Sequence, residues 1–302
     1  MRDYIIPLLE REKEIYFIQG MRMGKIPFSN AFLVKDCLFD TGISPIRLRN
    51  LKKNFTINKI IFSHWHDDHI RDNKRLGNIP RYCHTKERDI IENSEKILHQ
   101  YNLIGSEAEK MFRKFITEVI KIENININGT FQNGKIFDLG NELKFKAIHA
   151  PGHSAGHCIF YSKKERLAFL ADIDLSDFGP WYGANDSDLL QFEESIEMVS
   201  RLDLEIVVTG HSGLFKGRRL IKKKLNQYKR VISQRDEKIL AHMKEKKPIS
   251  ADDLYMKNLI YNSYGGFGDF IPIMERTMIQ KHFKKFLKKD IIEESNNGYI
   301  LN

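Results

Sequence analysis

Residues 63–69 read SHWHDDH and place three histidines and two aspartates directly after the apolar run KIIF. His64 and His66 are two positions apart at the end of a predicted strand, so their side chains leave the same face. Asp68 and His69 follow at the predicted turn into a helix. Imidazole nitrogens and carboxylate oxygens bind zinc and similar divalent metals, and a catalytic site keeps one position open for water. The segment therefore predicts part of a metal site, in which the two pairs can serve different metals.

Further ligands must come from other strand ends, which converge on one rim of a sheet. The candidates are His153 in APGHSAGH, Asp172 in FLADID and His211 in VVTGHSG. Each follows an apolar run and is flanked by the small residues that a tight turn at a metal needs. A single strand-end histidine is more often structural, but the joint pattern favours a metal site. Asp174, two residues after Asp172, stays open as an alternative.

The elements that would position these residues are short apolar or β-branched runs. EIYFIQG, NAFLV and CLFDTG indicate antiparallel strands, and NKIIFS, KFKAIHA, HCIFYS, RLAFLAD and EIVVTG indicate buried strands. Residues 85–119 lack strand signals and predict a helical insertion, either a lid over a pocket or an additional packing layer. The pattern is typical of a mixed α/β fold in which helices cover sheets.

A change of character after TGHSGLF predicts a domain boundary, with residues 1–215 in a first domain and residues 216–302 in a second. A long basic helix is followed by ISADDL, a helix-start signal, and by the amphipathic segment RTMIQKHFKKFLKKD. The end, IIEESNNGYIL, predicts a hairpin that turns at residues 296–298. Helix, helix, helix and hairpin is the order of a winged-helix domain.

Composition indicates a globular protein. The 302 residues are 41% hydrophobic, enough for one large core and a small second one. There is no run of roughly 18 apolar residues, and the first residues lack the apolar stretch of a signal peptide, so we expect a cytoplasmic protein with no membrane partner. Cys37, Cys83 and Cys158 are far apart, which suggests neither a disulfide framework nor a cysteine zinc site.

The positive charge is concentrated in the last third of the chain. Residues 214–302 contain 20 Lys and Arg and 10 Asp and Glu, a net charge of +10. Residues 1–213 contain 29 Lys and Arg and 30 Asp and Glu, a net charge of −1, so the whole chain carries +9. Such asymmetry can mark a surface for nucleic acid or another acidic partner. The alternative is a solvated, Lys-rich helical surface.

The motifs SHWHDDH, APGHSAGH, LADID and TGHSG, preceded by LFDTG, resemble in order those of metallo-β-lactamase-fold hydrolases over about residues 13–215. The resemblance implies an αββα sandwich with the site at one edge between the sheets. It also implies two divalent metal ions, with zinc expected and iron or manganese possible. One departure is Ala171, where the family usually has glycine. The implied ligands are His64, His66 and His153 for one metal and Asp68, His69 and His211 for the second, with Asp172 as the bridge and Asp40 supporting the histidine-rich loop.

The reaction that this resemblance implies is hydrolysis by a hydroxide held between two metals, without a covalent enzyme intermediate. Asp68 would also be catalytic, because it is placed to orient the nucleophile and to carry a proton to the leaving group. The aromatic segment DFGPWYGAND follows the bridging aspartate and contains Phe178, Trp181 and Tyr182. These residues form either a pocket wall, with the Tyr182 hydroxyl donating to the developing oxyanion, or a packed loop without substrate contact.

The motif set is similar to that of glyoxalase II and implies a small-molecule thioester, ester or lactone as substrate. The alternative is an endoribonuclease acting on single-stranded RNA through the basic C-terminal region, although that region lacks an aromatic stacking ladder. An iron-dependent sulfur dioxygenase and a non-catalytic metal-binding protein are weaker alternatives. The oligomeric state is left open.

Overall fold

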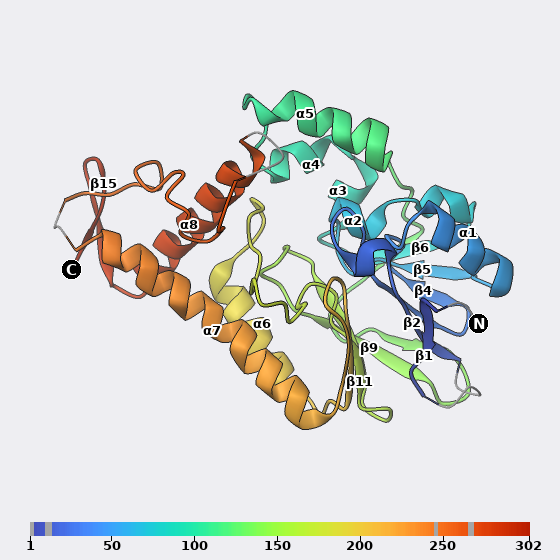
Figure 1. Ribbon diagram of the computed structural model, residues 1–302. Helices are drawn as coiled ribbons and strands as arrows, with labels where there is room; N and C mark the ends of the chain where they lie inside the picture. The colour runs from blue at the N-terminus through green and yellow to red at the C-terminus, as the bar shows by residue number, and fades with distance from the viewer. Residues whose placement is uncertain (1–2, 10–13, 245–246, 265–268) are drawn as a thin grey trace.

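Two β-sheets form the centre of the fold (Figure 1). The computed structural model describes residues 3–9, 14–244, 247–264 and 269–302. Antiparallel pairing joins the first four strands of the first sheet, and parallel pairing joins the rest. In spatial order, the first sheet contains β1 (Ile5–Pro7), β2 (Ile15–Ile18), β3 (Ala31–Val34), β4 (Cys37–Phe39), β5 (Lys59–Ile61), β6 (Arg81–His84) and β7 (Gly129–Phe131). The second contains β13 (Gly213–Lys216), β12 (Ile206–Thr209), β11 (Leu167–Phe169), β10 (Cys158–Ser162), β9 (Lys144–His149) and β8 (Ile136–Asp138).

The two sheets bury an aromatic layer between them. Phe32 and Phe39 from the first sheet meet Phe160 and Phe169 from the second, with ring centroids 5.9 Å apart for Phe32 and Phe169 and 4.6 Å apart for Phe39 and Phe160. All four side chains are inaccessible to solvent. Aromatic pairs at such distances add to the free energy gained from burial, so this layer fixes the sheets against each other.

Helices cover the outer face of each sheet, as Figure 1 shows, which confirms the predicted αββα sandwich. A separate hydrophobic cluster lies on each outer face. The first sheet carries α1 (Pro45–Asn54), α2 (Asp67–Ile70), α3 (Arg88–Glu92), α4 (Glu95–Gln100), α5 (Ala108–Lys114), the short 3-10 helices η2 (Met21–Gly24) and η3 (Asn73–Leu76) and the π-helical turn η4 (Phe115–Ile120). The second sheet carries α6 (Leu189–Ser200) and α7 (Arg218–His242), and α8 (Phe270–Lys288) packs against α6.

The C-terminal region differs from the prediction in one element. The hairpin of β14 (Ile292–Ser295) and β15 (Gly298–Leu301) turns at Asn296 and Asn297, as predicted. The predicted helix at ISADDL is wrong, because residues 251–256 form turns. Met256 and Asn258 have φ angles of 58° and 54°, a left-handed conformation that ends any helix there. The observed order is helix, turns, helix and hairpin, and the winged-helix comparison stays a prediction.

One hydrophobic cluster crosses the predicted domain boundary at residue 215. Phe192 and Val207 on its N-terminal side share this cluster with Ile232 and Phe283 on its C-terminal side. The last third of the chain therefore packs directly on the second sheet and on α6. Within the described part of the chain, no helix combines the length and the apolar character that a membrane span requires.

Candidate metal centre

All seven predicted ligands lie together at one edge of the sandwich. His64 and His66 follow β5, Asp68 and His69 are in α2, and the others follow β9, β11 and β12. Within each of two groups, the potential ligand atoms lie within 4.8 Å of one another. The groups are His64, His66, His153 and Asp172, and Asp68, His69 and His211.

Three imidazole nitrogens converge in the first group. His153 Nε2 lies 2.8 Å from His66 Nδ1 and 3.2 Å from His64 Nε2. The opposite nitrogens point outward: His64 Nδ1 lies 2.9 Å from Ser63 Oγ, and His153 Nδ1 donates to the Trp181 carbonyl at 2.9 Å. Because the Ser63 hydroxyl donates to Asp40, its oxygen accepts from His64 Nδ1. The inward nitrogens of His64 and His153 are therefore unprotonated in the neutral rings.

The second group is built in the same way. His69 Nε2 and His211 Nε2 lie 3.3 Å apart. On the outer side, His69 Nδ1 donates to the Asp40 carboxylate at 2.7 Å, and His211 Nδ1 donates to the Gly24 carbonyl at 2.6 Å. Asp68 Oδ2 lies 3.3 Å from His211 Nε2. The predicted supporting position of Asp40 thus agrees with the geometry.

Asp172 lies between the two groups. Its Oδ1 is 2.9 Å from His69 Nε2, and its Oδ2 is 3.2 Å from His153 Nε2 and 3.4 Å from His211 Nε2. The carboxylate of Asp174, the alternative bridge, accepts instead from a backbone N–H two residues further on. The geometry therefore favours Asp172 as the residue shared by both groups.

The neutral imidazoles and the carboxylates of the two groups favour a bound cation. Burial, and then the neighbouring histidines, hold the pKa values of His64 and His66 well below their usual range, so these rings are neutral at neutral pH. Burial also lowers the pKa of His211, but the Asp172 and Asp68 carboxylates outweigh it and raise the value to about 10. In the first group, the unprotonated nitrogens that face one another at 2.8–3.2 Å repel unless a positive charge lies between them. The donor set of imidazole and carboxylate fits zinc, iron or manganese.

Tyr182 does not have the contacts that its predicted catalytic role requires. Its side chain is fully buried, and its hydroxyl lies 2.7 Å from His282 Nε2 and accepts from Arg235 at 3.1 Å. Trp181 is the aromatic residue at the histidines, with its ring centroid 5.2 Å from that of His66. The geometry therefore supports a packed role for Tyr182 and a wall of the site at Trp181.

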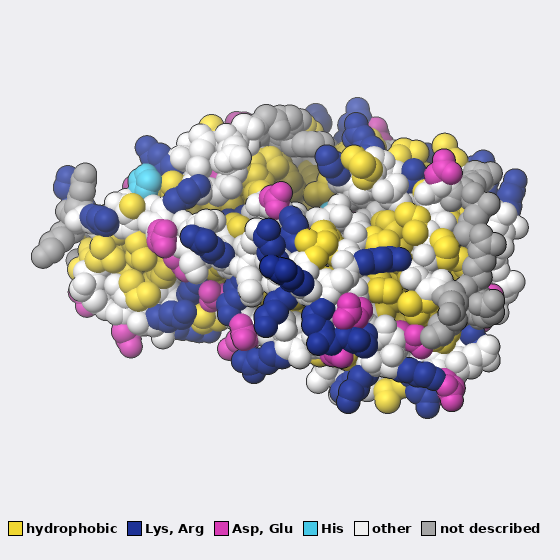
Figure 2. Space-filling view, turned by 60° about the horizontal axis from the view of Figure 1, so that its bottom comes forward, with side chains coloured by type: hydrophobic (Ala, Val, Ile, Leu, Met, Phe, Trp, Pro, Cys, Tyr) yellow, Lys and Arg dark blue, Asp and Glu magenta, His cyan; other side chains and the backbone are white. Residues whose placement is uncertain are grey.

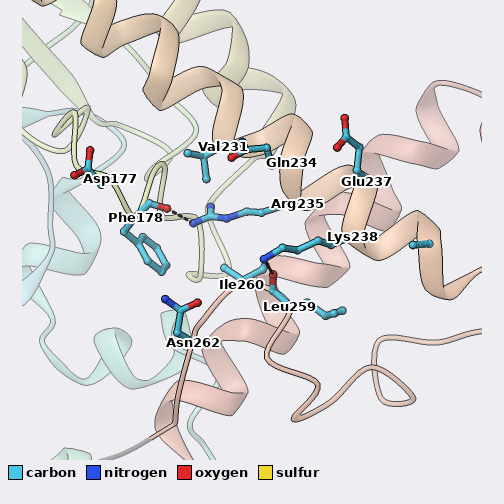
Figure 3. A pocket seen from close by; sticks show the side chains of 11 residues that line it. Asp177, Phe178, Val231, Gln234, Arg235, Glu237, Lys238, Leu259, Ile260 and Asn262 are labelled. Carbon is cyan, nitrogen blue, oxygen red and sulfur yellow. Dashed lines mark hydrogen bonds between the residues drawn. The ribbon is translucent and has the colours of Figure 1, made fainter.

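Phe178, the third aromatic residue of that segment, lines a separate pocket of about 650 Å³ (Figure 3). The pocket lies between this loop, α7 and residues 259–262, and none of the seven ligands is among the described residues that line it. Arg235 donates to the Phe178 carbonyl at 2.6 Å and thereby fixes this wall. The pocket is thus distinct from the metal centre.

Tyr101 of the helical insertion lies beside the metal centre. The Tyr101 hydroxyl donates to Asp67 at 2.9 Å, and its ring lies 5.9 Å from that of His66. Asn102 donates to Thr277 of α8 at 3.1 Å. The insertion therefore packs against both the ligand loop and the C-terminal region, and a lid movement stays a prediction.

Two supporting carboxyl groups, Glu87 and Asp186, were not singled out by the sequence. Glu87 is fully buried, and burial, followed by the charge of Asp186, raises its pKa to about 8. Both contact the loops that carry the ligands of the first group. The sequence gives no local signal for these two acids, because their contacts with the loops join residues that are 22 to 121 positions apart in the chain.

Comparisons with known proteins agree with this geometry. The model of the metallo-beta-lactamase superfamily matches residues 26–211, and the chain belongs to that superfamily. It is a metallo-hydrolase of that class. An uncharacterized protein from Aquifex aeolicus is 23% identical over 180 residues, 58% of this chain and 77% of its own length.

Two relatives of stated activity are similar over shorter regions. A hydroxyacylglutathione hydrolase from Mesorhizobium japonicum is 29% identical over 129 residues, 43% of this chain and 38% of that protein. An atrochrysone carboxyl ACP thioesterase from a Cryptosporiopsis species is 23% identical over 122 residues, 40% of this chain and 28% of that protein. The chain therefore matches less than half the length of each.

Solved structures extend the similarity of fold to the C-terminal region. A beta-lactamase domain protein from Burkholderia ambifaria superposes with a TM-score of 0.72 at 15% identity, over 100% of this chain and 95% of that chain. A metallo-beta-lactamase family protein from Thermus thermophilus gives a TM-score of 0.64 at 16% identity, over 99% and 97% of the two chains. At these identities the likeness concerns the fold alone.

Proposed function

We propose that this protein hydrolyses a thioester, or a related ester or lactone, with two divalent metal ions, most simply zinc. The observation that carries the proposal is the pair of ligand groups that share the Asp172 carboxylate. The hydroxyacylglutathione hydrolase and the ACP thioesterase among its relatives support a thioester as the substrate class.

An apolar rim beside the second group also supports an acyl substrate. The segment of residues 20–28 lies against His211, whose Nδ1 donates to the Gly24 carbonyl. Met23 and Ile26 in this segment are 60% and 71% exposed. Exposed apolar side chains next to a polar site favour contact with the hydrocarbon part of a ligand.

The residues of the chain have separable roles in this reaction. Two bound metal ions would supply the Lewis acidity that activates a water molecule and polarises the carbonyl group. Asp68 is only 7% exposed and faces His211, so it can orient the attacking water and pass a proton to the leaving group. Trp181 packs against His66 and His153 and limits access of bulk water.

Charge pairing weakens the case for RNA as the substrate. Figure 2 shows Lys and Arg side chains on one face with Asp and Glu among them. Three basic residues at the start and middle of α7 are paired with acids of the first two hundred or so residues: Arg218 with Asp203, Lys224 with Asp177 at 3.0 Å, and Lys229 with Glu197 at 2.6 Å. Part of the basic excess is thus neutralised within the chain.

The proposal is tested by measuring kcat/KM for glutathione and coenzyme A thioesters, a lactone and end-labelled single-stranded RNA, at low and high salt. We expect metal-dependent thioester hydrolysis that changes little with salt and falls by roughly 100-fold or more in Asp68→Asn. RNA cleavage that weakens steeply with salt, without thioester turnover, would support the endoribonuclease instead. Oxygen consumption with a persulfide substrate, or no turnover at all, would also contradict the proposal.

A further inference from the structure

Glu87 is a buried carboxyl group outside the two ligand groups. It lies between β6 and α3, and none of its side chain is exposed to solvent. A carboxyl group in such a position is costly unless donors satisfy its oxygens, so its partners indicate what it is for.

The donors to Glu87 come from the two loops that carry the histidines of the first group. Its Oε2 accepts from the Trp65 backbone N–H at 2.7 Å, and Trp65 lies between His64 and His66. Its Oε1 accepts from the Ser154 hydroxyl at 2.9 Å and the Gly156 N–H at 2.5 Å, directly after His153. One carboxyl group therefore joins the segments that hold all three histidines.

Asp186 makes a second connection between the same loops. Its Oδ2 accepts from the Trp65 indole N–H and from the Ala155 N–H, each at 3.0 Å. Gly156 leaves the room that this arrangement needs, because a Cβ at that position would lie 2.5 Å from Glu87 Oε1. In the second ligand group, Asp40 accepts from His69 Nδ1; it also accepts from Ser63 behind His64 of the first group.

We propose that Glu87 is a positioning residue for the first metal: it fixes the spacing of His64, His66 and His153 and so sets the affinity of that group selectively. The inference rests on the proposed function, since it assumes that metal binds there. Supporting residues of this kind typically change metal affinity by about 10- to 100-fold when they are replaced. The second group, supported by Asp40, would keep its affinity.

The test compares Glu87→Gln with Glu275→Gln. The amide nitrogen of glutamine cannot accept from Trp65 or Gly156, so one loop loses its connection. Glu275 is a matched control, because it is also buried and accepts from the backbone N–H groups of residues 259–261 at 2.8–3.2 Å, within the C-terminal region. For each variant, chelator competition gives the two metal affinities, and urea unfolding without metal gives the stability.

We expect Glu87→Gln to weaken one of the two sites by at least about tenfold, while Glu275→Gln loses stability but keeps both affinities. Wild-type affinities in Glu87→Gln, or equal weakening in both variants, would overturn the inference. If Glu87→Gln does not fold, Gly156→Ala displaces the same carboxyl group and must weaken the same site. Wild-type protein that binds no metal would instead overturn the proposed function.

Discussion

At the scale of single residues, four of the five ligand imidazoles are oriented by a hydrogen-bond partner on their outer side. Ser63, Asp40, Gly24 and Trp181 each bind an outward nitrogen and leave the inward nitrogen free. Local spacing predicts the four candidates within residues 64–69, and positions after apolar runs predict His153, Asp172 and His211; the family resemblance assigns all seven to two metals. It does not predict carbonyl partners such as that of Gly24, which is 187 positions from His211.

Gly210 allows the bridging carboxylate to approach its neighbours. A Cβ at this position would lie 2.5 Å from Asp172 Oδ1 and 2.9 Å from His69 Cε1. We therefore expect Gly210→Ala to displace Asp172 and to lower metal-dependent kcat/KM by about tenfold or more. Gly129→Ala is the control, because its Cβ would contact only the Tyr82 ring. Equal activity in the two variants would contradict the expectation.

The buried environment of His84 predicts that the free energy of unfolding falls in acid. Burial, and then His149 and Lys86, lower its pKa from 6.5 to about 4, and its ring stacks on that of His149 at 4.4 Å. Because the folded-state pKa is depressed, the neutral ring contributes its full stabilisation above pH 6.5, and this contribution is lost progressively as the pH falls from 6.5 to about 4. In urea unfolding at about pH 7 and about pH 5, His84→Gln should show a smaller loss of stability than the wild type. An equal loss of stability between the two pH values in the wild type and in His84→Gln would exclude His84 as the source of the pH dependence.

At the scale of elements, α7 fixes the loop that forms one wall of the metal centre. Arg235 donates to the Pro180 carbonyl at 2.5 Å and to the Phe178 carbonyl at 2.6 Å. Between these positions and Tyr182 lies Trp181, whose carbonyl binds His153. The sequence marked this loop as aromatic but did not indicate which ring faces the histidines, since that depends on an arginine 55 positions from Pro180.

Replacement of Arg235 should lower the free energy of unfolding and disturb the loop of residues 178–182 beside the metal centre. Arg235→Met removes three hydrogen bonds of a buried guanidinium and leaves two carbonyls without their donor, which should cost about 2–4 kcal/mol in urea unfolding. Tyr182→Phe removes one hydroxyl and should cost only about 1 kcal/mol, with kcat and KM unchanged. A large fall in kcat for Tyr182→Phe at normal stability would restore its predicted catalytic role.

At the scale of the whole molecule, β2–β5 and β9–β12 were predictable because each contains a short apolar or β-branched run followed by turn residues. Mixed segments such as β6 (RYCH) and β7 (GTF) were not predicted as strands. The incorrect helix prediction at residues 251–256 has a local cause. The Asp253 carboxylate accepts from Ser250, as a helix start requires, but the chain then enters left-handed conformations at Met256 and Asn258. The packing of α7 and α8 on the second sheet depends on contacts between distant segments, which periodicity alone does not specify.

The shared core predicts that the first 217 residues do not form a stable protein. A chain that ends at Gly217 would lose Ile221, Leu225, Tyr228 and Ile232, all of which are buried in the cluster with Phe192. We expect this truncation to lack a cooperative unfolding transition. A soluble fragment with a cooperative transition and full activity would show that residues 218–302 form an independent domain.

The central claim is that two metal ions share Asp172, and elemental analysis tests it most directly. We would measure metal per chain in protein purified without added metal, for the wild type and for Asp172→Asn in parallel. The account predicts about two equivalents of divalent metal in the wild type and a clear loss in the variant. Absence of metal from the wild type, or the same two equivalents in both proteins, would contradict it.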